Sequence, residues 1–312
     1  MNADATAFVL ALVFGCRQES PPVGDVPAPF EAAQDAEVLA AHADRLARIQ
    51  AELAQSAPTP DDWFGYYTGL RTKEDSESFA YARESGCVWK LCDGESGSNS
   101  GRVLREEDDG LDVEWIVDPM RSTCWQTPWG EPQLSSRLVK VHWGELKFLI
   151  QRERMRSFCN DVNSGLVRAG REYPCRTGVG ASDQVPAGIP LVPAEYRDWL
   201  LETPVESTIS EVRELPLVAT SERADRYVKQ VQATVPVGSA QRVSMGMALH
   251  LIPDGEEHWS DAAGWDGRVV QVERDRAVVE FRRAADLWEP TKAMFRVGRR
   301  VSTRAPLPAG NH

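Results

Sequence analysis

The chain lacks the features that identify a helical membrane-spanning protein or an enzyme of a common class. No apolar run in its 312 residues reaches the roughly 18 residues of a membrane-spanning helix. It contains no G-x-S-x-G, no G-x-x-x-x-G-K-[ST], no G-x-G-x-x-G after a strand pattern and no H-E-x-x-H. These absences favour a non-catalytic function. A carbohydrate hydrolase stays open as an alternative, because the paired carboxylates of a glycosidase need no local motif.

Basic residues are outnumbered, and residues that bind metals are few and scattered. The 35 Lys and Arg stand against 47 Asp and Glu, a formal net charge of −12. This balance argues against nucleic acid as a partner, because phosphate binding needs a basic face. The five His and six Cys show no C-x-x-C or H-x-x-x-H spacing, so we predict no metal and no other cofactor. The acidic stretch 106–109 lacks the ligand spacing of a calcium loop, and we expect a solvated hairpin tip there.

The cysteines apart from Cys16 are odd in number, so at least one has no partner within the chain. They are Cys87, Cys92, Cys124, Cys159 and Cys175. Cys159 shares one helix face with apolar residues and is expected to be a buried thiol. An alternative pairs Cys159 with His142 as nucleophile and base.

Strand-like segments dominate the region that follows residue 60. Short runs rich in aromatic and β-branched residues alternate with turn clusters at about 8–12-residue spacing, which is typical of antiparallel barrels and sandwiches. We therefore predict a mainly β fold with a few helices (α+β). It has two small antiparallel β-barrel or sandwich domains, at 61–203 and 204–306, preceded by an N-terminal helix and followed by a tail at 307–312. Within the first domain, Leu138–Gly165 reads as a hairpin that leads into a helix. We also predict a short helix at 194–202 and strands at 207–213 and 227–235.

Residues 17–60 combine a Pro-rich spacer with a helix. Four prolines between positions 21 and 29 indicate a stiff, extended segment. From Glu31 to Gln55 the chain has neither Pro nor Gly, and its apolar stripe predicts a helix. The stripe consists of Leu39, Ala43, Leu46, Ile49 and Leu53. The helix is either a coiled-coil stalk that makes oligomers or a single helix that packs on its own domain.

The C-terminal domain carries a local excess of positive charge. Between Arg268 and Arg304 there are ten Lys or Arg and five Asp or Glu. Such a surface attracts an anionic polymer or lipid headgroup; alternatively, the strands scatter these charges over several faces. The candidate contacts are Arg282, Arg283, Lys292, Arg296, Arg299 and Arg300.

The N-terminus resembles a bacterial lipoprotein signal. A short apolar run ends in Val13-Phe14-Gly15-Cys16, and polar residues follow at once. The match to a lipobox covers Val13, Gly15 and Cys16. The resemblance implies cleavage of the first residues and lipidation of Cys16. Because Arg17 stands where inner-membrane retention would need Asp, the resemblance also implies the outer membrane, with the protein facing the periplasm.

Two further resemblances concern the β domains. Gly65-Tyr66-Tyr67-Thr68-Gly69 followed by hairpins resembles small envelope β-barrels of the lipocalin-like kind. The glycines near 238, 246 and 267 resemble small β-barrel modules of bacterial envelope proteins, and they are expected at tight turns where a Cβ has no room. Together the resemblances imply a non-catalytic envelope lipoprotein that binds a partner protein or cell-wall polymer. The alternatives are a lipocalin-like carrier of a small ligand and an envelope carbohydrate hydrolase.

Overall fold

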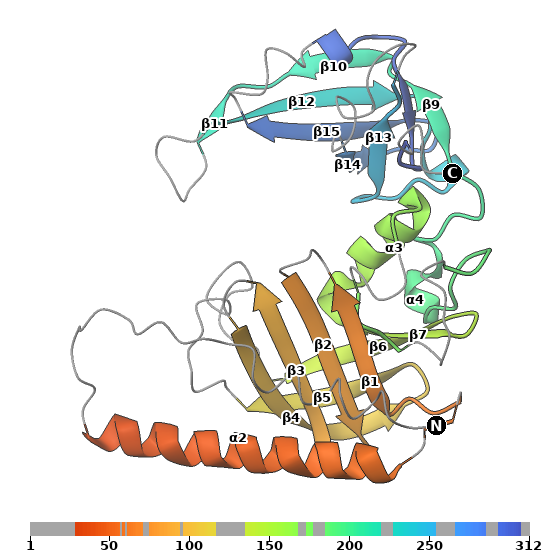
Figure 1. Ribbon diagram of the computed structural model, residues 1–312. Coiled ribbons are helices and arrows are strands. Elements are labelled where there is room, and N and C mark those ends of the chain that lie inside the picture. Colours follow the sequence, from red (N-terminus) through yellow and green to blue (C-terminus); the bar gives the residue numbers. More distant parts are fainter. Residues whose placement is uncertain are drawn as a thin grey trace. The chain divides into compact units, whose positions relative to one another are not determined.

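The computed structural model describes residues 29–56, 58–59, 61–70, 75–93, 96–116, 135–167, 173–176, 185–219, 227–253, 266–284 and 293–306 (Figure 1). The lipobox residues Val13, Gly15 and Cys16, the Pro-rich spacer up to residue 28, Lys292 and the C-terminal tail lie outside these ranges. The chain forms two compact units. One comprises Met1–Tyr66, Arg71–Leu104 and Val113–Ser135, and the other Tyr67–Leu70, Arg105–Asp112 and Ser136–His312.

The fold is mainly β, which confirms the predicted class. Strands β1 to β8 form a closed antiparallel barrel in sequence order, and β9 to β16 form a second, curled sheet. The barrel strands are β1 (Gly65–Leu70), β2 (Asp75–Ala82), β3 (Gly86–Asp93), β4 (Ser96–Glu107), β5 (Gly110–Ile116), β6 (Ser135–Trp143), β7 (Leu146–Gln151) and β8 (Cys175–Arg176). The two-residue strand β8, which the sequence patterns did not indicate, pairs with both β1 and β7 and so closes the barrel.

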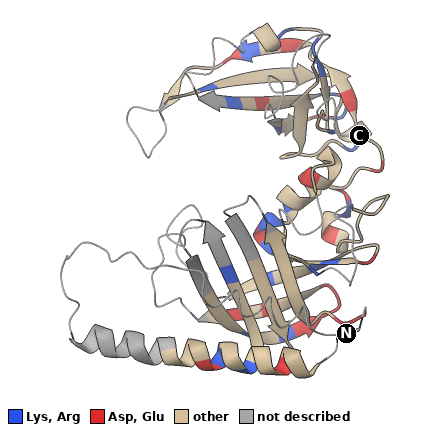
Figure 2. Cartoon of the chain, in the orientation of Figure 1, with Lys and Arg blue, Asp and Glu red and all other residues tan. Residues whose placement is uncertain are grey.

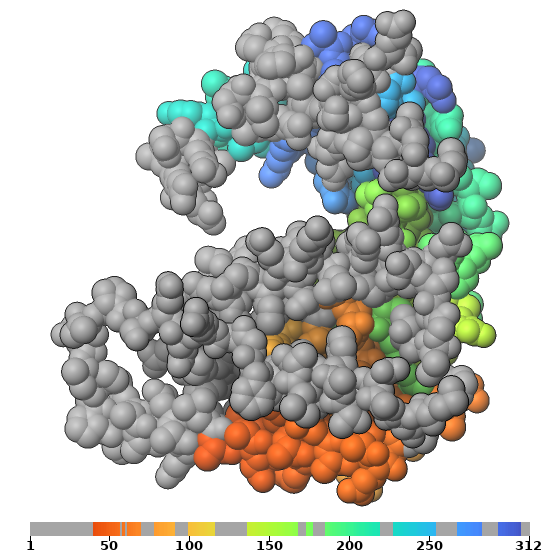
Figure 3. Space-filling view, viewed as in Figure 1, coloured from red at the N-terminus to blue at the C-terminus, as the bar shows by residue number. Residues whose placement is uncertain are grey.

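The N-terminal helix α2 (Pro29–Gln55) packs on the first of the two units, to which it belongs. Ile49 and Leu53 of the predicted stripe are buried, whereas Ala43 is exposed. Glu52 accepts hydrogen bonds from the backbone N–H groups of Glu84 and Ser85, in the turn between β2 and β3. Arg48 and Asp44 of α2 form an exposed ion pair. The part of α2 whose side chains are described carries basic and acidic residues (Figure 2), and its outer surface is uncovered in the space-filling view (Figure 3). The buried positions favour the helix that packs on its own domain over the coiled-coil stalk.

The hairpin β6–β7 continues through a short 3-10 turn, η2 (Arg152–Arg154), into helix α3 (Met155–Ser164), as predicted. Alternation along the hairpin places Val139, Val141, Phe148 and Ile150 on one face, where they join Phe158 of α3 in a single core. Gly165 ends α3 in the left-handed conformation at φ 70°. The next helix, α4 (Ala194–Arg197), is shorter than its apolar pattern predicted, because only one turn forms before the chain leaves the helix at Asp198.

The second sheet has the strand order β10-β12-β15-β14-β13-β16-β9, with β11 (Val218–Ala219) beside β12. Its strands are β9 (Glu206–Thr208), β10 (Glu211–Glu214), β12 (Tyr227–Val235), β13 (Ala248–Leu251), β14 (Asp266–Val272), β15 (Ala277–Ala284) and β16 (Arg300–Ser302), with a 3-10 turn η3 (Ser239–Gln241) after β12. The sequence predicted one strand at 207–213. The chain instead crosses at Ile209 and Ser210, so that β9 and β10 lie at opposite edges of the sheet.

The glycines of this sheet stand where a side chain would collide with neighbouring atoms. A Cβ on Gly238 would lie 2.2 Å from the carbonyl oxygen of Glu273, and one on Gly267 would lie 2.5 Å from Cγ1 of Val279. Gly246 occupies a turn at φ 84°. The expected lack of space is therefore confirmed. Gly267 lies inside β14, however, and the prediction of a turn at that position was wrong.

Candidate functional site

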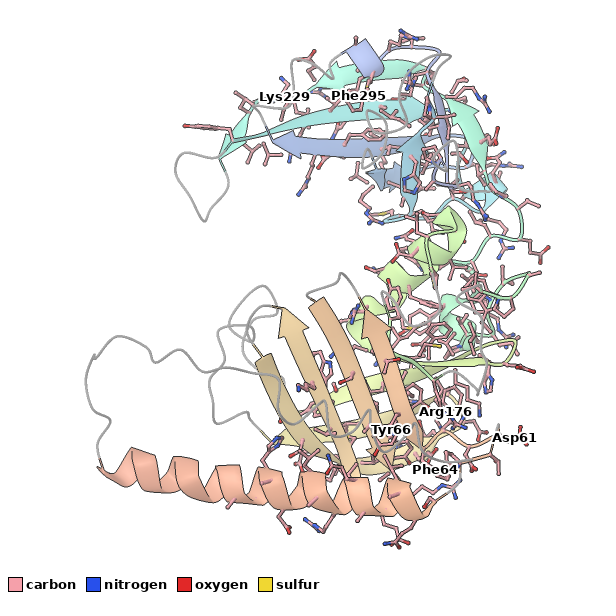
Figure 4. All side chains as sticks on the ribbon, in the orientation of Figure 1. Asp61, Phe64, Tyr66, Arg176, Lys229 and Phe295 are labelled. Carbon is pink, nitrogen blue, oxygen red and sulfur yellow. The ribbon has the colours of Figure 1, made fainter. Side chains whose placement is uncertain are left out.

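The structure distributes the predicted anionic-partner contacts over several parts of the second sheet. Arg299 is fully buried, at 0% exposure, so its side chain is removed from any docking surface and that part of the prediction is wrong. Arg300 pairs with Glu206 of the neighbouring strand β9 at 3.1 Å. Arg296 is exposed in the segment before β16. In the ladder, Arg283 of β15 pairs with Lys229 of β12; Lys229 is labelled in Figure 4. Lys292 lies outside the described residues. These positions agree with the alternative that the charges scatter.

Arg282, by contrast, belongs to a group of three arginines that share one face of the sheet. The ladder places Arg213 of β10 opposite Gln232, Gln232 opposite Glu280, and Glu280 opposite Arg268 of β14. Arg282 follows two residues after Glu280, so its side chain points to the same side. We call Arg213, Arg268 and Arg282 the arginine face. Sequence reasoning missed Arg213 and Arg268 as partners of Arg282, because their juxtaposition depends on the register of β10, β12, β15 and β14.

The side chains of the arginine face point to solvent because the residues that alternate with them along the strands are apolar and buried. Val231, Ala233, Val279 and Phe281 alternate with the polar positions of β12 and β15 and fill the core of the sheet. Burying these residues fixes which side of each strand faces solvent, since a slip of one residue would exchange the two faces. The charge pattern of this face is thus a consequence of the core on its other side.

One carboxylate organises the arginine face. Nε of Arg282 donates to Oε1 of Glu280 at 2.8 Å, and Nε2 of Gln232 lies 3.5 Å from Oε2 of the same side chain. The side chain of Glu280 is only 12% exposed, whereas that of Arg282 is 67% exposed. Glu211 contributes a second carboxylate in the next row of the ladder. Arg213, Arg268 and Arg282 are exposed, and their planar donors suit carboxylate or phosphate groups.

The acidic stretch 106–109 forms the exposed tip of the β4–β5 hairpin, as predicted, and several of its carboxylates bind basic side chains. Arg137 of β6 donates to Glu107 at 2.7 Å and to Asp109 at 2.5 Å, and its other terminal nitrogen donates to Asp112 at 2.8 Å. The ammonium of Lys140 lies 2.8 Å from Glu106. Hydrogen bonds from Arg137 and Arg105 hold the pKa of the Asp112 carboxyl below its usual range although burial opposes that shift. Arg137 and Lys140 thus bind carboxylates that a calcium ion would need as ligands.

Cys159 and His142 do not form a nucleophile–base pair. Cys159 lies in the core between α3 and the face of β6 that carries Val141 and Trp143, and His142 points from the other face of the same strand. Burial raises the pKa of the Cys159 thiol to about 12, so the thiolate is scarce at neutral pH. Cys87 is also a buried free thiol, and its pKa is raised by burial as well.

The described ranges contain neither a metal-binding cluster nor a helix suited to cross a membrane. Those residues contain no group of three or more His, Cys, Asp or Glu placed to hold a metal ion. Among the same residues, no helix has the length and apolar character needed to cross a membrane.

Comparisons with known proteins found no match, so the functional inference rests on the geometry described above. No protein-family model matches the chain, and no curated protein or solved structure matches it.

Proposed function

We propose that this protein is a non-catalytic binding protein of the cell envelope, lipid-anchored at Cys16 in the outer membrane, whose second β domain binds an anionic cell-wall polymer. The arginine face carries the proposal, because three exposed guanidinium groups from neighbouring strands share one side of a rigid sheet. Arginine forms paired hydrogen bonds with carboxylate and phosphate, the groups that make such polymers anionic.

Sedimentation with insoluble peptidoglycan tests the proposed binding. We expect the full-length protein to co-sediment at low salt and to be released at about 0.5 M NaCl, where exposed charges are screened within a few ångströms. Replacing all three arginines together (Arg213→Gln, Arg268→Gln and Arg282→Gln) should abolish co-sedimentation.

Arg300→Gln provides a matched control for the triple variant. Arg300 is an exposed arginine of the same sheet, but it pairs with Glu206 of β9 at 3.1 Å, at the edge opposite β10. This variant should co-sediment like the wild type. Undiminished binding of the triple variant would show that the arginine face is not the binding surface. Capture of another envelope protein, with no peptidoglycan bound, would assign the face to a protein partner instead.

A separate experiment tests the proposed lipid anchor at Cys16. Labelled palmitate should appear on the protein in growing bacterial cells, and Cys16→Ser should remove the label. If the label persists in Cys16→Ser or never appears, the lipobox interpretation is wrong. In that case the sedimentation result still decides the proposed binding function.

A further inference from the structure

The carboxylate of Glu280 lies within the arginine face and is largely withdrawn from solvent. In the ladder of β12, β15 and β14, Glu280 stands between Gln232 and Arg268. Arg282 follows two residues later on the same strand and points to the same side. Phe281, between the two, is buried in the core of the sheet, so the backbone of β15 is anchored at this point. Glu280 is therefore held against the sheet beside arginine side chains.

Burial of this carboxylate creates the need for a cation. The side chain of Glu280 is 12% exposed, and burying an ionised carboxylate is costly unless it is paired and hydrogen-bonded. Nε of Arg282 donates to Oε1 of Glu280 at 2.8 Å, a charge-assisted bond of the stronger kind. Nε2 of Gln232 lies 3.5 Å from the other carboxylate oxygen. Glu280 therefore restricts the rotamers of Arg282, a long side chain that loses much conformational freedom when it is ordered.

The same bond leaves the far end of Arg282 to a ligand. A guanidinium carries five N–H donors, one on Nε and four on the two terminal nitrogens. Glu280 takes the donor on Nε, while the side chain of Arg282 is 67% exposed. With Nε engaged, a bound anion forms paired hydrogen bonds end-on, with Nη1 and Nη2. The planar fork of these nitrogens matches the two oxygens of a carboxylate.

We propose that Glu280 is a positioning residue of the polymer-binding surface. It holds Arg282 by Nε and presents Nη1 and Nη2 end-on to a carboxylate of the polymer. This inference rests on the proposed function and adds the mode of recognition to it. Ordering a rotamer-rich side chain opposes binding, so a guanidinium that is already held in place binds its anion more tightly. Glu280 thus increases the affinity for an anionic polymer although its own charge is negative.

Two substitutions of Glu280 separate positioning from charge. Glu280→Leu removes the acceptor and should weaken co-sedimentation with peptidoglycan about threefold to tenfold, although it also removes a negative charge. Glu280→Gln removes the same charge but keeps an oxygen that accepts from Nε, and should bind within about twofold of the wild type. Circular dichroism confirms that each variant is folded. Equal or tighter binding of Glu280→Leu would show that Glu280 competes with the polymer and would overturn the inference.

Chemical amidation of the peptidoglycan tests the predicted carboxylate. Amidation replaces each anionic carboxylate by a neutral amide, which offers no second acceptor to the fork of Arg282. The wild type should lose co-sedimentation with the amidated polymer. Undiminished binding of amidated peptidoglycan would overturn end-on recognition of a carboxylate.

Glu206→Leu provides the matched control for the substitutions of Glu280. Glu206 also pairs with an arginine, Arg300 at 3.1 Å, at the edge of the sheet opposite β10, and its replacement changes the net charge by the same amount. This variant should co-sediment like the wild type. In an Arg282→Gln background, Glu280→Leu should change the remaining binding by less than about twofold, because the side chain that Glu280 positions is gone. An equal loss in both backgrounds would show that Glu280 does not act through Arg282.

NMR of the nitrogen-labelled protein distinguishes failure of this inference from failure of the proposed function. The Nε–H signal of Arg282, identified by its loss in Arg282→Gln, should exchange slowly with water in the wild type and rapidly in Glu280→Leu. This measurement needs no polymer. If the signal behaves in this way but the wild type does not bind peptidoglycan, Arg282 is positioned and the proposed function is wrong. If the wild type binds but the signal exchanges equally in both proteins, the function stands and the positioning role is wrong.

Discussion

The side-chain amide of Asn160 on α3 donates to the carbonyl oxygen of Gly246 at 3.0 Å, just before β13 of the second sheet. Its own oxygen accepts a hydrogen bond from the N–H of Ala248 at 2.9 Å. One turn on, Asn163 makes an equivalent pair of bonds with Trp199 and Leu201. Oγ of Ser164 then lies 2.7 Å from Nε2 of His250. The polar side chains of α3 thus hydrogen-bond backbone groups that have no partner in a strand ladder. These bonds explain how three buried polar residues are tolerated on one helix.

Replacing Asn160 by Leu is expected to destabilise the protein by about 2–3 kcal/mol. The variant keeps the volume but leaves the N–H of Ala248 and the carbonyl of Gly246 buried without their partners. Urea denaturation measures the change in unfolding free energy. Ser157→Ala, an exposed position on the same helix, should change it by less than about 0.5 kcal/mol. Equal stability of the two variants would mean that Asn160 does not support the backbone of β13.

Arg137→Met is expected to reduce stability at pH 7 by about 1 kcal/mol, because a half-buried cation that serves three carboxylates is lost. The pKa of Asp112 is depressed in the folded state. Its contribution is therefore present above the unfolded pKa of about 4 and is lost as the pH falls through the folded value.

The stability difference between wild type and Arg137→Met should accordingly shrink below about pH 4. Thermal unfolding between pH 3 and pH 7 measures this trend. Arg48→Ala, which removes an exposed helical ion pair with Asp44, should show little effect at any pH. A difference that stays constant across the range would contradict the assigned role of Asp112.

The thiols of Cys87 and Cys159 should resist alkylation in the folded protein. Both are buried, and burial raises the pKa of Cys159 to about 12, so little reactive thiolate forms at pH 8. Treatment with iodoacetamide followed by mass spectrometry should detect modification of these two residues after unfolding in urea but not before. Rapid labelling of native Cys159 would show that this thiol is reactive and would reopen a catalytic role for it.

Ile49→Ala is expected to cost about 2–4 kcal/mol, because Ile49 is fully buried where α2 packs on its own unit. Urea denaturation at two protein concentrations gives both the loss and its dependence on association. A helix that packs within one chain predicts a loss independent of concentration. A loss that grows on dilution would instead support the coiled-coil stalk.

The sequence predicted elements well where local patterns are strong. The hairpin β6–β7 shows alternation, α3 shows a helical period and a glycine stop, and the boundaries of β12 match their prediction. Prediction from the sequence failed where a strand pairs with segments that are distant in the sequence. The two residues of β8 carry no periodic pattern, yet they close the barrel by pairing with β1 and β7. The single strand expected at 207–213 divides because its halves form the two edge strands of the sheet, β9 beside β16 and β10 beside β12.

The candidate sites follow the same division. Composition indicated a basic C-terminal region but could not separate buried Arg299 from exposed Arg282. Local sequence determined the mainly β class, the N-terminal helix and the apolar faces, because these depend on periods of a few residues. Tertiary structure alone decided that Arg213 joins Arg268 and Arg282 on one face of the second sheet. The physical reason is strand register, which brings residues distant in sequence to neighbouring positions and depends on burial of the whole core.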